Sequence, residues 1–488
     1  MKKISSIILL TLFVQISFSQ TNEPISKDHS EEWKKMNASK KATFEWFKDA
    51  KYGMFIHWGL YAIPAGVWKE KTLKEYKSSQ LAEWIMSSAK IPRAEYAELA
   101  NQFNPVEFNA DSIALLAKEA GMKYVVLTSK HHDGFAMYNS KASKFNIVDA
   151  TPFKRDVLKE LYDACKRHGL DFGVYYSHNI DWMDGGDGQV AVAIANQWNV
   201  GIKKTDFGAN TWDPSPNTFE EYLQNKAYPQ VKELMHNYPD LKCLWYDMPW
   251  RLKPEQSYEF YKIVYDIQPQ VIITDRIGNG LGDYIIPGDN KIPVDAYGIE
   301  KPWETVGTHN NSWGYKSYDN DWKTPKEMLF WLIDIVSKGG NYMLNIGPTS
   351  EGVVPQQSAN NLRVAGKWLK VNGEAIYGTE KWKIMHEGPT KLNMEGTTER
   401  SRKGFTANFT NEDFWFTQKG KCLYAISIEK PTASAFVKSF KSEIGKIKKV
   451  EIIGVGKLKF IQKEDGLSIK IPNGFCPENG YVIKVTLK

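Results

Sequence analysis

Polar side chains follow five short apolar runs of the sequence, at the point where each run ends. Four of the nine histidines stand at such ends, together with one aspartate and one arginine. These residues are His57, His131, His132, His178, Asp247 and Arg276. A single histidine in this setting is as often a buried structural residue, with its hydrogen bonds made inside the protein, as a functional one. Groups of this kind at five strand ends instead indicate one shared site.

Three kinds of catalysis use such a set of residues. A metal-dependent hydrolase would take its ligands from His57, His131, His132 and Asp247, but no His-x-His pair ends the first run and no His-Glu-x-x-His motif occurs. A phosphate-binding barrel would use a Gly-rich loop near its last strand. Gly339-Gly340 lies at such a place, but a tight turn into the last strand explains it more simply. A glycosidase needs paired carboxyl groups and partners for sugar hydroxyls, which this inventory supplies most fully.

These residues need a framework that brings strand ends together. Longer amphipathic stretches separate the apolar runs, so that strands and helices alternate along the chain. The predicted strands are 52–58, 124–130, 172–177, 241–247, 271–276 and 342–346, and the predicted helices are 111–119, 154–168, 218–236, 254–267 and 326–337. Near-continuous apolar strands indicate a parallel sheet covered on both faces. The sequence therefore predicts an α/β fold, a (β/α)8-type catalytic barrel over residues 41–380.

The pattern changes near residue 380, where the helical periods stop. Short alternating runs follow, separated by turns that contain Gly, Asn, Lys and Pro. The predicted strands there are 414–418, 422–428, 449–453, 467–471 and 481–487. We therefore expect an all-β domain, a C-terminal β-sandwich, over residues 381–488.

The composition is that of an ordinary globular protein. Apolar residues make up 42% and charged residues 25% of the 488 residues, and aromatic residues reach 13%, which suits stacking on sugars as well as a Trp-rich core. The net charge of +6 is spread along the chain without a basic block, so we expect no nucleic-acid partner. Cys165 and Cys243 lie inside apolar segments and are predicted to be buried free thiols.

The first twenty residues have the pattern of a secretory signal peptide. Lys2 and Lys3 precede an apolar run from Ile7 to Phe18, and small polar residues follow it. We therefore predict a signal peptide over residues 1–20 and a loose lead-in over residues 21–40. The mature protein is expected to be exported, either to a periplasm or to the exterior. No later segment is long and apolar enough to predict a membrane span.

The motifs at the strand ends resemble those of the α-L-fucosidases of glycoside hydrolase family 29. The resemblance runs in order over roughly residues 40 to 380 and is carried most specifically by the His-His-Asp-Gly and Trp-x-Asp elements. The matching segments are 52–59, 129–135, 173–177, 244–247, 313–315, 337–341 and 344–348. It implies an exo-acting hydrolase that retains configuration through a covalent fucosyl-enzyme intermediate, without metal or organic cofactor. Its implied partner is a fucosylated oligosaccharide or glycoconjugate.

The resemblance also implies roles for individual residues. The aspartate of the Trp-x-Asp strand end is the family's nucleophile, which corresponds to Asp247. The residues that the resemblance places around the sugar are His57, Glu83, Trp84, His131, His132, Tyr176, Trp245 and Arg276. Successive strand residues face opposite sides, so either Tyr175 or Tyr176 could point inward.

The acid/base needs a separate argument, because the family's usual glutamate is absent. Gly288 stands after Pro287 where many relatives have that residue. The nearest carboxyl groups are those of Asp289, Glu300 and Glu304. We favour Glu304, since the adjacent Trp303 could desolvate it and raise its pKa.

Two other functions remain open from the sequence. A carbohydrate-binding protein that has lost catalysis would explain the missing glutamate, and a metal-dependent barrel hydrolase would lose activity on chelation. The sequence leaves undetermined the fucosyl linkage, the oligomeric state and the role of the C-terminal domain.

Overall fold

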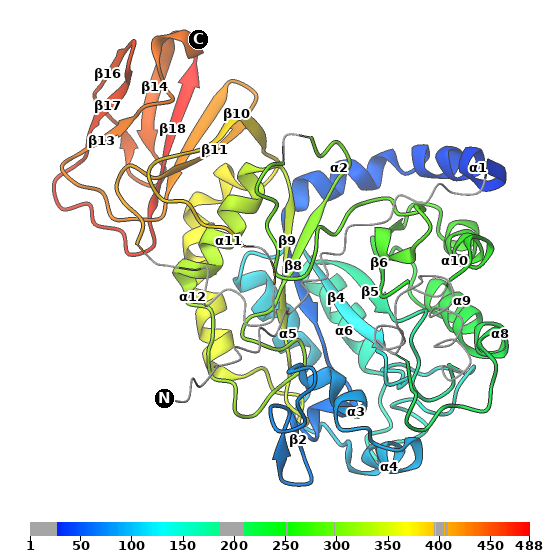
Figure 1. The fold of residues 1–488 in the computed structure, drawn as a ribbon. Coiled ribbons are helices and arrows are strands. Elements are labelled where there is room, and N and C mark those ends of the chain that lie inside the picture. The colour runs from blue at the N-terminus through cyan, green and yellow to red at the C-terminus, as the bar shows by residue number, and fades with distance from the viewer. Residues whose placement is uncertain are drawn as a thin grey trace, which may run out of the picture.

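The computed structural model describes residues 27–185, 209–249, 252–296, 298–394, 396, 405 and 408–488. A barrel of parallel strands surrounded by helices makes up the larger part, and a domain of antiparallel strands lies beside it (Figure 1). The predicted signal peptide at residues 1–20 lies outside the described residues.

Seven parallel strands form the curled sheet of the barrel, in the order β7-β6-β5-β4-β1-β9-β8. They are β1 (Tyr52–Ile56), β4 (Tyr124–Lys130), β5 (Asp171–Tyr176), β6 (Cys243–Tyr246), β7 (Ile272–Ile273), β8 (Glu304–Gly307) and β9 (Asn341–Ile346). Every residue of β1, β4 and β9 is buried, as expected for strands covered on both faces. The predicted α/β barrel fold is confirmed.

An irregular segment, residues 284–289, lies between the two edge strands β7 and β8. Its parallel bridges join Thr274 to Tyr284, Ile285 to Trp303, and Asp289 to Val306. The segment thus occupies the eighth position of the barrel and links its two edges. Neither this segment nor β8 contains an apolar run long enough to be recognised as a strand, so both are absent from the predicted strands.

Helices cover the outside of the barrel (Figure 1). They are α2 (Lys41–Ala50), α5 (Ala110–Glu119), α6 (Val157–His168), α8 (Phe219–Tyr222), α9 (Tyr228–Asn237), α10 (Pro254–Ile267), α11 (Pro325–Ser337) and α12 (Gln356–Asn372). Local signals set their ends: Asp156 caps the amino end of α6, and Gly169, with φ of 71°, ends it. The predicted helices are all present, and α2 and α12 are additions. Between β1 and α5 lie β2 (Val67–Trp68), β3 (Lys71–Thr72), α3 (Ile85–Ser88) and α4 (Arg93–Ala97).

The segment expected to be a loose lead-in contains a helix, α1 (Lys27–Ala38). The Trp33 indole donates a hydrogen bond of 2.7 Å to the carbonyl of Leu281. Close to the end of α1, Lys40 and Asp283 form an ion pair of 2.7 Å with both side chains fully buried. These contacts tie the helix to the barrel, which the polar composition of the segment did not reveal.

Antiparallel strands begin at Glu380 and form two sheets. The larger sheet contains β10 (Glu380–Glu387), β11 (Phe414–Lys419), β12 (Cys422–Ser427), β18 (Tyr481–Leu487), β14 (Ile447–Ile452) and β15 (Gly456–Lys457) in that order. The smaller sheet contains β13 (Ser434–Val437), β17 (Gly466–Lys470) and β16 (Phe460–Lys463). A separate apolar core that includes Phe416, Val437 and Ile483 lies between them. The domain packs on α11 and α12, where the Trp415 indole donates to Asp334 at 3.0 Å.

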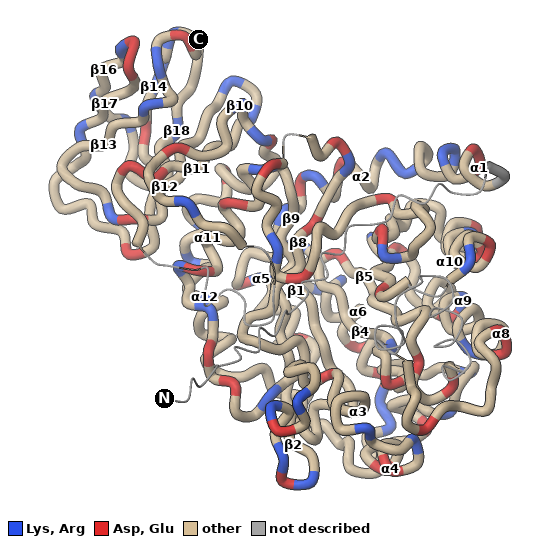
Figure 2. Tube along the Cα trace, in the orientation of Figure 1, with Lys and Arg blue, Asp and Glu red and all other residues tan. Residues whose placement is uncertain are grey.

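Acidic and basic residues are interspersed along the described chain, and no extended segment carries charges of one sign only (Figure 2). Among the described helices, none is long and apolar enough to cross a bilayer. Cys165 and Cys243 are buried free thiols, as predicted.

Candidate active site

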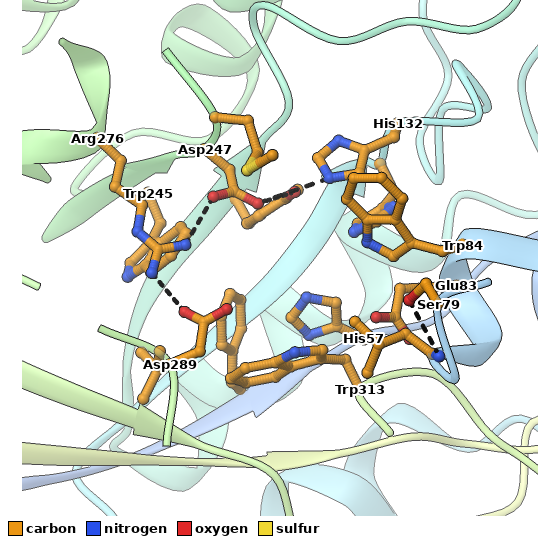
Figure 3. A pocket seen from close by; sticks show the side chains of 16 residues that line it. His57, Ser79, Glu83, Trp84, His132, Trp245, Asp247, Arg276, Asp289 and Trp313 are labelled. Carbon is orange, nitrogen blue, oxygen red and sulfur yellow. Dashed lines mark hydrogen bonds and ion pairs between the residues drawn. The ribbon is translucent and has the colours of Figure 1, made fainter. Parts of the chain in front are cut away.

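A pocket opens at the carboxyl ends of the barrel strands (Figure 3). Its volume is about 130 Å³. The lining side chains are those of Phe55, His57, Ser79, Leu81, Glu83, Trp84, His131, His132, Tyr175, Trp245, Asp247, Met248, Arg276, Asp289, Val306 and Trp313. Eight of the ten residues predicted from the sequence are in this set, and Tyr176 and Glu304 are not.

Asp247 lies directly after β6 and points into the pocket (Figure 3). Its two carboxylate oxygens have different partners: Tyr175 donates to Oδ2 at 2.9 Å, and Arg276 donates to Oδ1 at 2.8 Å. The Nε2 atom of His132 lies 3.8 Å from Oδ2. These two hydrogen bonds hold the carboxylate group of Asp247 in one orientation.

Tyr175, and not Tyr176, is the tyrosine of this strand that faces the pocket. The Tyr176 hydroxyl donates to Gln230 at 2.8 Å, on the side of the strand covered by helices. The expected role of Tyr176 in the pocket is therefore corrected. Neighbouring residues of a strand point to opposite faces, and only the seating of β5 in the barrel decides which one points inward.

Glu304 lies beneath the pocket and does not line it. It is the first residue of β8 and is 1% exposed, and the Tyr124 hydroxyl donates a hydrogen bond to it. Burial raises the pKa of Glu304 to about 7, against the hydrogen bond that lowers it. The expectation of a desolvated carboxyl group was right, but this group is not among the side chains that line the pocket. Glu300 is exposed and likewise absent from the lining.

Asp289 is one of three carboxyl groups that line the pocket, with Asp247 and Glu83. It ends the segment that closes the barrel and pairs with Val306, which is two residues beyond Glu304 on the same face of β8. Two residues of a strand span about 6.6 Å, so Asp289 stands higher, near the rim. Arg276 binds Asp289 through one terminal nitrogen and Asp247 through the other (Figure 3).

The negative charges of Asp247 and Asp289 stabilise the positive charge of the Arg276 guanidinium between them. Burial of the guanidinium opposes its charge, but the carboxylates of Asp289 and Asp247 outweigh burial and raise the pKa of Arg276. The guanidinium also lies over the Trp245 ring, 4.9 Å from its centroid. One cation thus holds two carboxylates on the same wall of the pocket.

The pocket histidines His57 and His131 are buried and uncharged. Burial lowers the pKa of His57 to about 3, against a hydrogen bond with Asn345 that raises it. Burial, with the neighbouring His132, lowers the pKa of His131 well below its usual value. A neutral imidazole donates a hydrogen bond at one ring nitrogen and accepts one at the other, which suits recognition of hydroxyl groups.

Glu83 and Trp84 reach the pocket from a short 3₁₀ helix, Ala82–Trp84. The backbone N–H of Gly314 donates to Oε2 of Glu83 at 2.8 Å, whereas Oε1 has no partner among the described residues. Burial raises the pKa of Glu83 to about 7. A buried oxygen without a partner costs free energy unless a ligand supplies a donor, which marks Oε1 as a position for a hydroxyl.

Aromatic rings make up much of the remaining wall. Trp245 stacks on Tyr175 with ring centroids 5.6 Å apart, and Trp313 lies 5.1 Å from the His57 ring. Four further residues line the pocket from loops and from β8, namely Ser79, Leu81, Met248 and Val306. No sequence motif marks these four residues as part of a site. Among the residues that the structure describes, no three His, Cys, Asp or Glu side chains are grouped so as to hold a metal ion.

Two family models match most of the chain. The α-L-fucosidase family model matches residues 17–374, and the α-L-fucosidase C-terminal domain model matches residues 407–486. Plasma α-L-fucosidase of Homo sapiens is 29% identical over 453 residues, which cover 88% of this chain and 85% of that protein.

Solved structures extend the likeness to the fold. The α-L-fucosidase from Vibrio sp. strain EJY3 matches with a TM-score of 0.75 and 31% identity, covering 93% of this chain and 74% of that one. An α-L-fucosidase from Lactobacillus casei, solved in complex with α-L-fucose product, matches with a TM-score of 0.60 and 41% identity, covering 68% of this chain and 99% of that one. The chain therefore belongs to the α-L-fucosidases of glycoside hydrolase family 29.

Proposed function

We propose that the protein is an exo-acting α-L-fucosidase that removes terminal α-L-fucose from glycans with retention of configuration. The observation that carries the proposal is the pair of carboxylates, Asp247 and Asp289, bound to the two ends of one guanidinium. Such a span is compatible with the separation of about 5–5.5 Å used by retaining glycosidases. A pocket of about 130 Å³ has room for one sugar ring, which favours action at a chain end.

In the first step the Asp247 carboxylate attacks the anomeric carbon, and the bond from that carbon to the leaving oxygen breaks. Asp289 gives its proton to the leaving oxygen, so that an alcohol departs and a fucosyl ester remains on Asp247. In the second step Asp289 takes a proton from water, whose oxygen attacks the anomeric carbon and releases Asp247. Because Arg276 pairs with the Asp289 carboxylate in this structure, we infer that entering substrate separates the two and that Asp289 then takes up from solvent the proton that it donates.

The test is hydrolysis of an aryl α-L-fucoside by the wild type and by Asp247→Gly and Asp289→Gly, each with and without azide. We expect Asp247→Gly to be nearly inactive and to form the β-fucosyl azide when azide is added. Asp289→Gly should form the α-fucosyl azide and should lose less activity with good leaving groups than with poor ones. Glu304→Gln serves as the control for a carboxyl group outside the pocket.

Two results would contradict the proposal. If Asp289→Gly keeps full activity on poor leaving groups while a Glu304 variant yields the α-azide, Glu304 is the acid/base. If the wild type binds L-fucose but releases no aryl alcohol, the protein is a carbohydrate-binding protein. An assay after treatment with a chelator tests the metal-dependent alternative, since the mechanism proposed here should be unaffected.

We also propose that the protein is exported, on the strength of the apolar segment after Lys2 and Lys3. The test is cell fractionation together with sequencing of the mature amino terminus. Export predicts a terminus near residue 20 and activity outside the cytoplasm, and an intact Met1 in the cytoplasmic fraction would contradict it.

A further inference from the structure

The hydrogen bonds behind His132 determine which of its ring nitrogens carries the proton. Nδ1 lies 2.7 Å from the Ser177 hydroxyl oxygen, and the same hydroxyl donates its only proton to the carbonyl of Ile180 at 2.8 Å. The hydroxyl can therefore only accept from His132, which places a proton on Nδ1.

A similar chain of hydrogen bonds stands behind His57. Its Nδ1 lies 2.7 Å from Oδ1 of Asn345, and the amide nitrogen of Asn345 donates to the carbonyl of Trp313 at 2.7 Å. The second bond orients the amide, so that its oxygen faces the ring and accepts from Nδ1. Since His57 is uncharged, its single ring proton is on Nδ1 and its Nε2 bears a lone pair.

The distance between His132 and Asp247 agrees with an uncharged His132 ring. A protonated imidazole facing a carboxylate forms a hydrogen bond of about 2.7–2.9 Å, whereas Nε2 lies 3.8 Å from Oδ2. Two acceptor atoms at this separation are stabilised when a donor approaches both of them. Such a donor would be a hydroxyl next to the anomeric carbon, because Asp247 is the group that attacks that carbon.

We propose that Ser177 and Asn345 are positioning residues that hold His132 and His57 in the Nδ1–H form, so that both rings present Nε2 to the sugar as hydrogen-bond acceptors. The proposal rests on the proposed function of the pocket and specifies which hydrogen bonds the pocket uses to recognise the sugar. Oε1 of Glu83 is a third acceptor in the same pocket. The pocket is thereby selective for hydroxyl groups that donate, and a group that only accepts is rejected.

The direct test is ¹⁵N NMR of the full chain labelled at histidine, with resonances assigned from His57→Gln and His132→Gln variants. The expected spectrum at neutral pH shows both rings protonated at Nδ1 and unprotonated at Nε2. Nε2–H or doubly protonated rings would overturn the proposal. Because this measurement needs no turnover, its outcome is independent of the proposed activity.

The second test compares binding of L-fucose with its 2-deoxy and 2-deoxy-2-fluoro analogues by titration calorimetry. Fluorine keeps an acceptor and removes the donor, so the fluoro analogue should bind no better than the deoxy analogue, each about tenfold or more below L-fucose. Affinity of the fluoro analogue within about twofold of L-fucose would mean that the pocket atom is a donor and would overturn the assignment. If L-fucose itself does not bind, the proposed function fails instead.

A variant series separates positioning from stability. Ser177→Ala removes the acceptor for Nδ1 and should move the His132 proton toward Nε2, with a rise in KM and a smaller penalty for the fluoro analogue. Ser129→Ala is the matched control, because this buried hydroxyl also donates to a backbone carbonyl, that of Tyr175, and no hydrogen bond joins it to a histidine among the described residues. An unchanged His132 spectrum in Ser177→Ala, or the same change in Ser129→Ala, would refute the role of Ser177.

Discussion

Replacing Glu304 with glutamine should stabilise the protein at neutral and alkaline pH while leaving catalysis almost intact. The carboxyl group is buried in the barrel, and burial raises its pKa from 4.5 to about 7. Between these two values the unfolded chain has released the proton and the folded chain keeps it. The unfolded state then binds fewer protons, so the stability of the wild type falls as pH rises through this window.

The expected size follows from that pKa difference. Each unit of pKa corresponds to about 1.4 kcal/mol, so ionisation of Glu304 costs the wild type about 3 kcal/mol above pH 7 relative to pH 4.5. Glutamine carries no titrating proton, and its side-chain oxygen can still accept from the Tyr124 hydroxyl. The stability of Glu304→Gln relative to the wild type should therefore rise by about 3 kcal/mol between pH 5 and pH 8.

The assay is urea unfolding of both proteins at the two pH values, followed by the midpoint and slope of each transition. An exposed control, Glu119→Gln, should show little change with pH, because surface ion pairs such as the one with Arg363 contribute about 0–1 kcal/mol. A constant difference between Glu304→Gln and wild type would refute the burial argument. A loss of kcat/KM of about a hundredfold or more would refute the placement of Glu304 outside the reaction.

Three further outcomes are expected. Lys40→Met should destabilise the protein by about 3–5 kcal/mol in urea unfolding, because it leaves the Asp283 carboxylate buried without its cation, and adding Asp283→Asn should recover most of that loss. Arg276→Lys should lower kcat/KM on an aryl fucoside by about a hundredfold, because an ammonium does not hold the Asp247 carboxylate in the geometry that the planar guanidinium sets. Glu83→Gln should raise KM about tenfold and remove the decline of kcat/KM below about pH 7, since only the ionised carboxylate is a strong acceptor for a hydroxyl. An acid limb unchanged in Glu83→Gln would exclude Glu83 as its source.

Much of the site follows from the sequence alone, because its residues come directly after recognisable strands. The run Cys243–Tyr246 is apolar and short, and the residue that follows it must stand at the carboxyl rim of a parallel barrel. Asp247 could therefore be identified as the central carboxylate from local pattern and family resemblance. The same reasoning placed His57, His131 and His132 in the pocket, whereas His178, expected at the same rim, is buried and does not line it.

The choice between Tyr175 and Tyr176 was not available from the sequence. Both side chains are tyrosines with an apolar ring and a terminal hydroxyl, and both are fully buried in the structure. The direction of each side chain depends on how β5 seats between β4 and β6. That seating is a property of the assembled sheet, since a shift of one residue would exchange the two faces.

The acid/base candidate was decided by tertiary structure for a related reason. Sequence inspection correctly recognised Glu304 as a desolvated carboxyl group, but it could not show how deep in the barrel this group lies. The bridge between Asp289 and Val306 sets the height of the closing segment against β8 and lifts Asp289 to the rim. Local sequence thus determined the strands and the groups at their ends, whereas the register of non-local pairing decided which carboxyl group lines the pocket, because pairing partners distant in sequence leave no local signal.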